Sequence, residues 1–259
     1  MPLSSRFHWV MHTLLGFKVP TVQQSAVAAG GFCTWPFSQV RDPVKSLICS
    51  HTDTSGGICE MLAAKWLESH ANNGSIVNWI MDSSGTQVDP NKIRQLMQWF
   101  AVGVSMRAVA MNERSNEGGM DQSLATERWL RTHGVVRRRR ITGGVPLMGG
   151  GHFHHPRVLN GQRGRQSRSD FSADIAHGIT SSSGSYKMIG IEGSNFAHAM
   201  AAWSDQDVSF FDPNFGEFWF ARPEDFHAWF PRFWQLAGYA APMVGLSESY
   251  TIDEYAPTA

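Results

Sequence analysis

Apolar residues at helical spacing dominate the first half of the chain. Between Ile93 and Phe100 they recur every three or four positions, which places them on one face of a helix over 89–102. Asp89 precedes Pro90, an order typical of a helix start, because proline needs no N–H at the first helical position. Further helices are predicted over 57–70, 121–133, 171–177 and 223–230.

The second half of the chain changes to short apolar and aromatic runs bounded by polar turns, a pattern typical of β-strands. Strands are predicted over 186–191, 195–203, 207–211 and 216–220, followed by an extended stretch over 238–252. Helices that precede an antiparallel sheet indicate an α+β fold. We therefore expect one α+β domain over 51–259, whereas the pattern in residues 1–50 favours no particular element.

The segment 137–169 interrupts both patterns. It contains eight arginines, seven glycines and no acidic residue. Because it has few apolar side chains to offset the entropy lost on ordering, it is predicted to be a long basic loop or insertion. The run Arg137, Arg138, Arg139 and Arg140 could contact an anionic surface, although such runs are more often solvated.

The amino-acid composition excludes several classes of protein. The 259 residues carry 22 basic and 22 acidic side chains, which excludes a globally basic nucleic-acid binder. No run of about 18 apolar residues is present, so we expect no membrane span. The three cysteines, Cys33, Cys49 and Cys59, are too few and odd in number to form a disulfide framework. The N-terminal residues lack a signal-peptide cleavage site.

Cys59 has the sequence context of a reactive thiol. Gly56 and Gly57 allow a sharp turn into the predicted helix, and Cys59 follows in its first turn. The unpaired N–H groups and the positive end of the helix dipole stabilise a thiolate at such a position. A buried, inert cysteine is the alternative interpretation, and it applies to Cys33 and Cys49, which lack this context.

A cysteine nucleophile needs an imidazole and a group that orients the imidazole. His198 and Asp212 belong to two successive predicted strands. If the loop between them has three or five residues, the two side chains are directly opposed on one side of the sheet, with Cβ atoms about 4.5–5.5 Å apart. A loop of even length would turn His198 to the other face. A core histidine and an aspartate that begins a turn are the alternative interpretations.

At these positions the sequence resembles the YopT/AvrPphB-type cysteine peptidases, papain-like effectors that bacteria deliver into host cells. The resemblance rests on Gly57-Ile58-Cys59 before a helix that carries Trp66, on Ala197-His198-Ala199, and on the run from Phe211 to Glu217 before an aromatic strand. It implies a papain-like α+β fold. The helical part would carry Cys59 as nucleophile, and the sheet would carry His198 as general base and acid and Asp212 as its orienting group.

The resemblance also points to an oxyanion site. Papain-like enzymes usually carry an amide side chain five or six residues before the cysteine, and those positions hold Thr54 and Asp53 here. Thr54 can donate a hydrogen bond, whereas an ionised Asp53 would oppose a developing negative charge. The backbone N–H of Cys59 is available in either case.

The resemblance implies a thiol protease that acts on a protein substrate in the cytoplasm of a target cell, after secretion without a cleaved signal peptide. The same triad acting on a glutamine side chain would make the protein a deamidase. An arginine-rich binding module without activity is a third possibility. No cofactor is expected, and a metal site at His152, His154 and His155 is disfavoured because no carboxylate or cysteine lies nearby.

Overall fold

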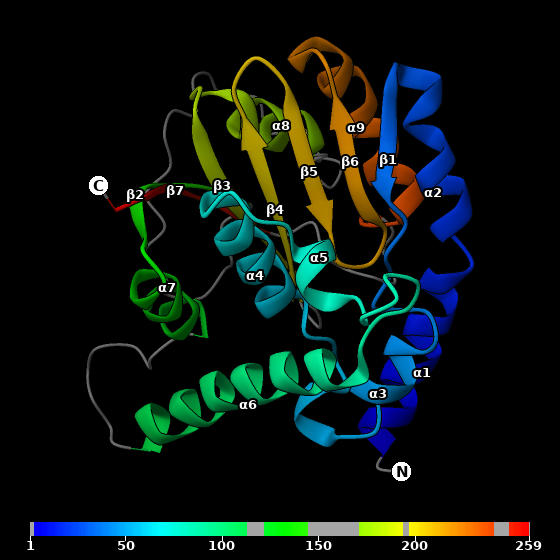
Figure 1. Cartoon of the computed structure of the whole chain (residues 1–259), viewed down its shortest axis with the longest axis vertical. Coiled ribbons are helices and arrows are strands. Elements are labelled where there is room, and N and C mark those ends of the chain that lie inside the picture. The colour runs from blue at the N-terminus through cyan, green and yellow to red at the C-terminus, as the bar shows by residue number, and fades with distance from the viewer. Residues whose placement is uncertain (1–2, 113–121, 145–170, 194–196, 241–248, 259) are drawn as a thin grey trace, which may run out of the picture.

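The computed structural model describes residues 3–112, 122–144, 171–193, 197–240 and 249–258. Within these ranges one antiparallel sheet of seven strands forms the centre, in the order β1-β6-β5-β4-β3-β7-β2 (Figure 1). The strands are β1 (Gly31–Trp35), β2 (Val135–Gly144), β3 (Ser185–Glu192), β4 (Ala197–Ser204), β5 (Val208–Asp212), β6 (Gly216–Phe220) and β7 (Ser249–Pro257). The predicted α+β class is confirmed.

Helices cover both faces of the sheet (Figure 1). They are α1 (Leu3–Gly16), α2 (Val19–Ser25), α3 (Val44–Ile48), α4 (Cys59–Ala71), α5 (Ile76–Ile80), α6 (Pro90–Asn112), α7 (Gln122–Thr132), α8 (Ser172–Thr180) and α9 (Pro223–Ala237). On one face, α4 packs on β3, β4 and β5 and is covered in turn by α6 and α7. On the other face, α8 packs on β4 and β7, and α9 packs on β6.

Strand β4 shows how the sheet serves two cores. Ala199 and Ala201 contact the core around α4, whereas Met200 and Ala202 contact the core around α8 and α9. Both sets are buried because successive side chains of a strand point to opposite faces. The small alanines on the α4 side allow this helix to approach the sheet closely.

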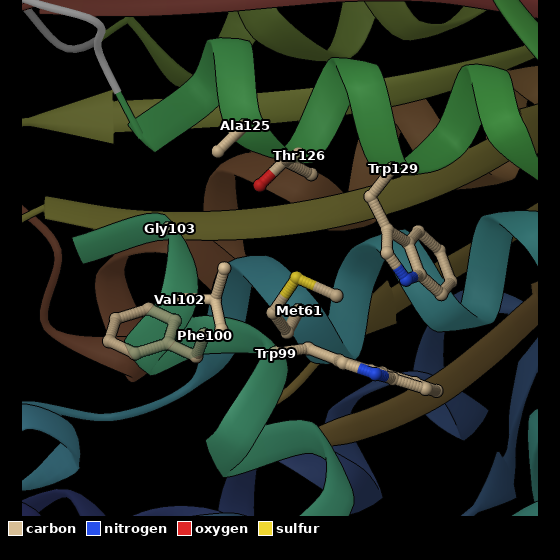
Figure 2. A pocket seen from close by; sticks show the side chains of 8 residues that line it. All are labelled: Met61, Trp99, Phe100, Val102, Gly103, Ala125, Thr126 and Trp129. Carbon is tan, nitrogen blue, oxygen red and sulfur yellow. The ribbon is translucent and has the colours of Figure 1, made fainter. Parts of the chain in front are cut away.

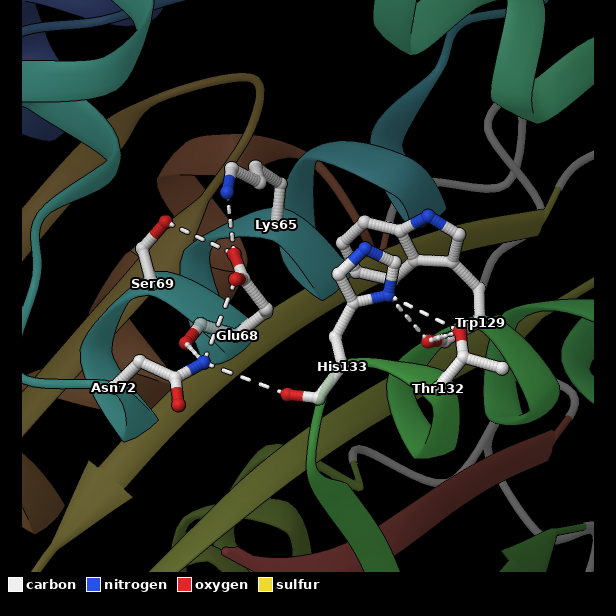
Figure 3. Close-up of polar contacts among 7 residues, drawn as sticks. All are labelled: Lys65, Glu68, Ser69, Asn72, Trp129, Thr132 and His133. Atoms are coloured by element: carbon white, nitrogen blue, oxygen red, sulfur yellow. Dashed lines mark hydrogen bonds and ion pairs between the residues drawn. The ribbon is translucent and has the colours of Figure 1, made fainter.

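The far end of α4 is tied to α7. Asn72 donates a hydrogen bond to the backbone carbonyl of His133 at 3.5 Å, and the rings of Trp129 and His133 stack with centroids 4.1 Å apart (Figure 3). On α4 itself, Lys65 forms an ion pair with Glu68. The bond from Asn72 therefore joins α4 to the residue that follows α7, at the end opposite Cys59.

Two helices extend further than the sequence predicts. The helix predicted over 89–102 continues to Asn112 in α6, and the helix predicted over 223–230 continues to Ala237 in α9. Pro231 lies inside α9, where proline removes a backbone hydrogen bond. The helix continues because Phe230, Phe233 and Trp234 on both sides of the proline are buried in the aromatic core.

Residues 1–50 contribute to the sheet, although their pattern favoured no element. β1 pairs with β6, with Gly31 opposite Phe220. A Cβ atom at position 31 would lie only 2.3 Å from the Phe220 ring, so this close pairing requires glycine. The strand is short, carries the polar residue Thr34 and begins with glycine, which explains why its sequence gives no strand signal.

The prediction of a loop over 137–169 is wrong for its first residues. Residues 137–144 belong to β2, which pairs with β7 apart from a register shift between Arg137 and Arg139. Arg140 binds both oxygens of Asp253, at 2.6 and 2.7 Å, and Arg137 forms an ion pair of 2.9 Å with Glu127. The segment holds no acid of its own, but β7 and α7 supply the acids that neutralise these arginines. Residues 145–169 lie outside the described part of the chain.

The aromatic core generates a stability prediction. Phe210 is fully buried on β5, and its ring contacts Phe218 of β6 together with Phe226, Trp229, Phe230 and Phe233 of α9. We expect Phe210→Ala to lower the free energy of unfolding by about 3–5 kcal/mol, because it leaves a cavity between the sheet and α9.

Urea denaturation followed by tryptophan fluorescence measures this change as a lower midpoint. Phe17→Ala is the matched control, since the Phe17 ring is 76% exposed and its loss should leave the midpoint nearly unchanged. Equal midpoints for the two variants would contradict the assignment of Phe210 to the centre of this core.

Candidate active site

Cys59 is the first residue of α4, and a tight turn precedes it. Gly57 has a φ of +117°, which a side chain would strain, and the side-chain oxygen of Gln39 lies 3.4 Å from where its Cβ would stand. Ile58 follows as the N-cap residue with no side-chain cap of its own. The predicted position of Cys59 in the first turn of a helix is confirmed, and α4 begins two residues after the predicted start.

His198 and Asp212 are in contact, but not in the predicted register. The loop between β4 and β5 has three residues, and Ala201 pairs with Phe211 and Ser204 with Val208. His198 therefore lies diagonally from Asp212, and direct opposition is wrong by two residues. Because a shift of two residues keeps side chains on the same face, Nε2 of His198 still reaches Oδ1 of Asp212 at 2.9 Å.

Asp212 is fully buried, and three donors surround its carboxylate. His198 and the backbone N–H of Asn214 donate to Oδ1, the latter at 2.7 Å, and the hydroxyl of Tyr239 donates to Oδ2 at 2.7 Å. Burial and the nearby Asp212 raise the pKa of Tyr239 well above its usual value, so Tyr239 keeps its proton and remains a donor. These bonds compensate for removing a carboxylate from water.

His198 is buried and interacts with both Asp212 and Cys59. Burial lowers the pKa of its imidazole, but the charges of Asp212 and Cys59, and hydrogen bonds to both, outweigh burial and raise the pKa to about 10. The imidazole is therefore protonated at neutral pH. Since Nε2 bonds to Asp212, Nδ1 is the nitrogen left for the sulfur of Cys59. This arrangement can hold a thiolate–imidazolium pair and move a proton at Nδ1.

The two residues predicted from the sequence for the oxyanion site, Thr54 and Asp53, lie in different environments. The buried hydroxyl of Thr54 donates to the carbonyl oxygen of Ile48 at 2.8 Å, and Asp53 is exposed to solvent. The amide side chain that does lie beside the cysteine turn belongs to Gln39, whose oxygen accepts from the backbone N–H of Ile58 at 3.0 Å. Sequence spacing missed Gln39, because it lies far before Cys59 in a segment without a periodic pattern.

Cys49 also has a histidine neighbour, but the pair differs in charge. The sulfur of Cys49 lies 3.6 Å from Nδ1 of His12, and both residues are buried. Burial lowers the pKa of His12 to about 4 and raises the pKa of Cys49, so both groups are neutral near pH 7. A neutral thiol beside a neutral imidazole provides no activated nucleophile.

A small cavity lies behind the cysteine helix, between α4, α6 and α7 (Figure 2). Its volume is about 130 Å³, and its lining is Met61, Trp99, Phe100, Val102, Gly103, Ala125, Thr126 and Trp129. Met61 follows Cys59 by two positions, which turns it about 200° around the helix axis. The cavity therefore lies on a different side of α4 from the cysteine.

Two further sequence predictions concern metals and membranes. Within the described ranges, no three His, Cys, Asp or Glu side chains gather into a group that could hold a metal ion. The histidines His152, His154 and His155 lie outside those ranges. None of the helices there is long and apolar enough to cross a bilayer.

A cysteine at the start of a helix, facing a histidine and an aspartate on neighbouring strands, is the arrangement of the papain-like cysteine peptidases. Comparison with known families agrees: the model of the Peptidase C58 family, described as Yersinia/Haemophilus virulence surface antigen, matches residues 23–245. The chain belongs to this family, and the resemblance seen in the sequence is confirmed.

Individual relatives support the same assignment. The chain is 30% identical over 251 residues to the cysteine protease YopT of Yersinia enterocolitica, which covers 94% of this chain and 70% of that protein. The YopT of Yersinia pseudotuberculosis gives the same identity and coverage. The crystal structure of the Pseudomonas avirulence protein AvrPphB superimposes with a TM-score of 0.53 at 16% identity, covering 80% of this chain and 95% of AvrPphB, and shares its fold. The protein is a cysteine peptidase of the bacterial effector type.

The geometry predicts which thiol reacts first. Burial raises the pKa of Cys33 to about 11 and also raises the pKa of Cys49, so both stay protonated, whereas Cys59 interacts with the protonated His198. We expect iodoacetamide at about pH 6 to alkylate Cys59 before the other two, because a thiolate is the reactive form. Peptide mass spectrometry after short exposures measures the order.

The His198→Ala variant is the control, since it should slow alkylation at Cys59 alone. Selective alkylation of Cys33, or equal rates at all three thiols in the native protein, would contradict the placement of the reactive cysteine at Cys59.

Proposed function

We propose that the peptidase acts through a triad of Cys59, His198 and Asp212. The observation that carries this proposal is the position of His198, whose Nε2 lies 2.9 Å from Oδ1 of Asp212 while its charge and hydrogen bonding are coupled to Cys59. Cys59 serves as nucleophile, His198 as acid and base, and Asp212 as the group that orients the imidazolium.

The reaction is acyl transfer in two steps. The thiolate of Cys59 attacks the carbonyl carbon of a peptide bond, and His198 gives its Nδ1 proton to the leaving amine as the C–N bond breaks. A water molecule then attacks the thioester while His198 accepts a proton from it. The C–S bond breaks, the carboxylic acid product leaves, and the thiolate–imidazolium pair is restored.

The start of α4 supplies the oxyanion donor in this proposal. The backbone N–H of Cys59 is in the first turn of the helix, where N–H groups have no partner within the helix. We assign the negative oxygen of the tetrahedral intermediate to this group. Thr54 is not used, because its hydroxyl already donates to Ile48, and Asp53 carries the wrong charge.

We further propose that the substrate is a protein inside a target cell. The names of the relatives, a virulence surface antigen family and the cysteine protease YopT, support a protease that acts in virulence.

A contact with an anionic surface would use Arg138 and Arg139, which are exposed on β2. Arg137 and Arg140 already pair with Glu127 and Asp253.

Substitution tests the triad. Cys59→Ala and His198→Ala should each reduce the rate of cleavage by about 10⁴-fold or more. The Asp212→Asn variant should keep a rate about tenfold to a hundredfold higher than either of these, as in other triads. The measurement is the rate at which new protein termini appear in a eukaryotic cell lysate, read by mass spectrometry. All three variants should keep the far-ultraviolet circular dichroism of the native protein.

The same experiment separates the possible reactions. A mass gain of about one dalton on glutamine side chains without new termini would replace the peptidase by a deamidase, since deamidation exchanges an amide for a carboxylic acid. Full activity of Cys59→Ala would reject the triad itself.

The charge of the triad generates a pH prediction. In the folded protein the pKa of His198 is raised from 6.5 to about 10, so the imidazolium persists across neutral pH and is lost only as the pH approaches 10. The alkaline limb of kcat/KM should therefore lie near pH 10. Asp212→Asn removes an anion that raises this pKa, so the limb should move to lower pH; a limb that stays in place would contradict the charge coupling.

A further inference from the structure

A continuous chain of hydrogen bonds joins the start of α4 to the buried carboxylate. The backbone N–H of Ile58 donates to Oε1 of Gln39 at 3.0 Å, and Nε2 of Gln39 donates to Oδ1 of Asn214 at 2.9 Å. Nδ2 of Asn214 contacts the hydroxyl of Tyr239 at 3.2 Å, and that hydroxyl lies 2.7 Å from Oδ2 of Asp212. Three side chains thus connect the cysteine turn with the aspartate.

The direction of every bond in this chain is fixed by its ends. Ile58 can only donate through its N–H, so the atom of Gln39 that faces it must be the oxygen. The nitrogen of Gln39 then faces Asn214, which must present its oxygen and turn its own nitrogen towards Tyr239. The hydroxyl of Tyr239 accepts that bond, and its proton is left for Asp212, which can only accept.

This hydrogen-bond network is shielded from water and anchored to the backbone. Gln39 and Asn214 are 2% and 5% exposed, and Tyr239 is fully buried. The backbone N–H of Gln39 donates to the carbonyl of Pro213 at 2.8 Å, and the hydroxyl of Ser38 donates to the carbonyl of Asn214 at 2.7 Å. Aligned hydrogen bonds in such a dry environment polarise one another, so a change at one end is felt at the other.

We propose that Gln39 is a positioning residue that sets, through Asn214 and Tyr239, the hydrogen bond donated to Asp212. This inference rests on the triad of the proposed function. Gln39 holds the turn before Cys59 through Ile58 and, with the same side chain, orients the amide of Asn214. The nucleophile and the group that orients His198 are thereby held in one network, although they belong to different layers of the fold.

The Gln39→Glu variant tests the direction of these hydrogen bonds, because glutamate has almost the same shape as glutamine. A protonated glutamate side chain at this position can replace glutamine, because its carbonyl oxygen accepts from Ile58 and its O–H donates to Asn214. An ionised one can only accept, so the amide of Asn214 must turn and present its nitrogen. The oxygen of Asn214 then takes the proton of Tyr239, and Asp212 loses a donor.

The measurement is the alkylation rate of Cys59 by iodoacetamide across pH. We expect the Gln39→Glu variant to show a titration that the native protein lacks, with a change in rate of about tenfold to a hundredfold where the new carboxyl ionises. Tyr239→Phe removes the same donor at every pH. The extra titration should therefore vanish in the Gln39→Glu/Tyr239→Phe double variant, since the two changes act on one bond.

Gln23→Glu is the matched control. Gln23 donates to the carbonyl of Phe215 at 2.9 Å in the neighbouring turn, but it is not part of the chain. Its variant should keep the native profile. A native profile for Gln39→Glu, or an extra titration that survives Tyr239→Phe, would overturn the inference. If Gln39→Glu does not fold, an alkylation profile of Tyr239→Phe that matches the native one overturns it instead.

The outcome is separable from that of the triad. If His198→Ala leaves the alkylation rate of Cys59 unchanged, the proposed triad fails. If His198→Ala and Asp212→Asn change the rate while Gln39→Glu does not, the triad stands and only the role of Gln39 is rejected.

Discussion

The burial of one carboxylate is the constraint on which the site depends. Asp212 has no contact with water, and a charge in that position is tolerated only when it is fully paired and hydrogen-bonded. Its partners come from three places: His198 from the adjacent strand, Asn214 from its own turn and Tyr239 from the turn that follows α9. The sheet and α9 must therefore pack correctly before the charge is accommodated, and the histidine then acquires its proton.

Close packing of α4 on the sheet supplies the other half of the site. The strand that carries His198 presents alanines to this helix, and the far end of the helix is held by α7. Because α4 is fixed at a short distance, its first residue Cys59 meets the imidazole without any connection along the chain between the two. The nucleophile and its base are thus brought together by packing of a helix against a sheet.

Local signals in the sequence predicted the parts of the site that depend on local structure. A glycine pair before a helix located Cys59. For His198 and Asp212 the sequence supplied only a condition, an odd-length hairpin loop, and the three-residue loop of the structure meets it. The register within the hairpin was wrong by two residues, because the turn residues did not specify where pairing begins. Gln39 and Tyr239 could not be found in this way, because only the tertiary fold brings them to the site. The same limit explains β2, whose arginines are neutralised by acids distant in sequence.

The order of these elements along the chain has a consequence for synthesis. Gln39 lies before the nucleophile and Tyr239 lies 180 residues after it, so the site joins segments from near both ends of the described chain. Long-range contacts of this kind form late in folding, because each must first overcome the entropy of closing a long loop. A nascent chain that has exposed Cys59 but not yet α9 therefore lacks a completed charge network. We expect the newly made enzyme to remain inert on the ribosome until α9 has docked on the sheet.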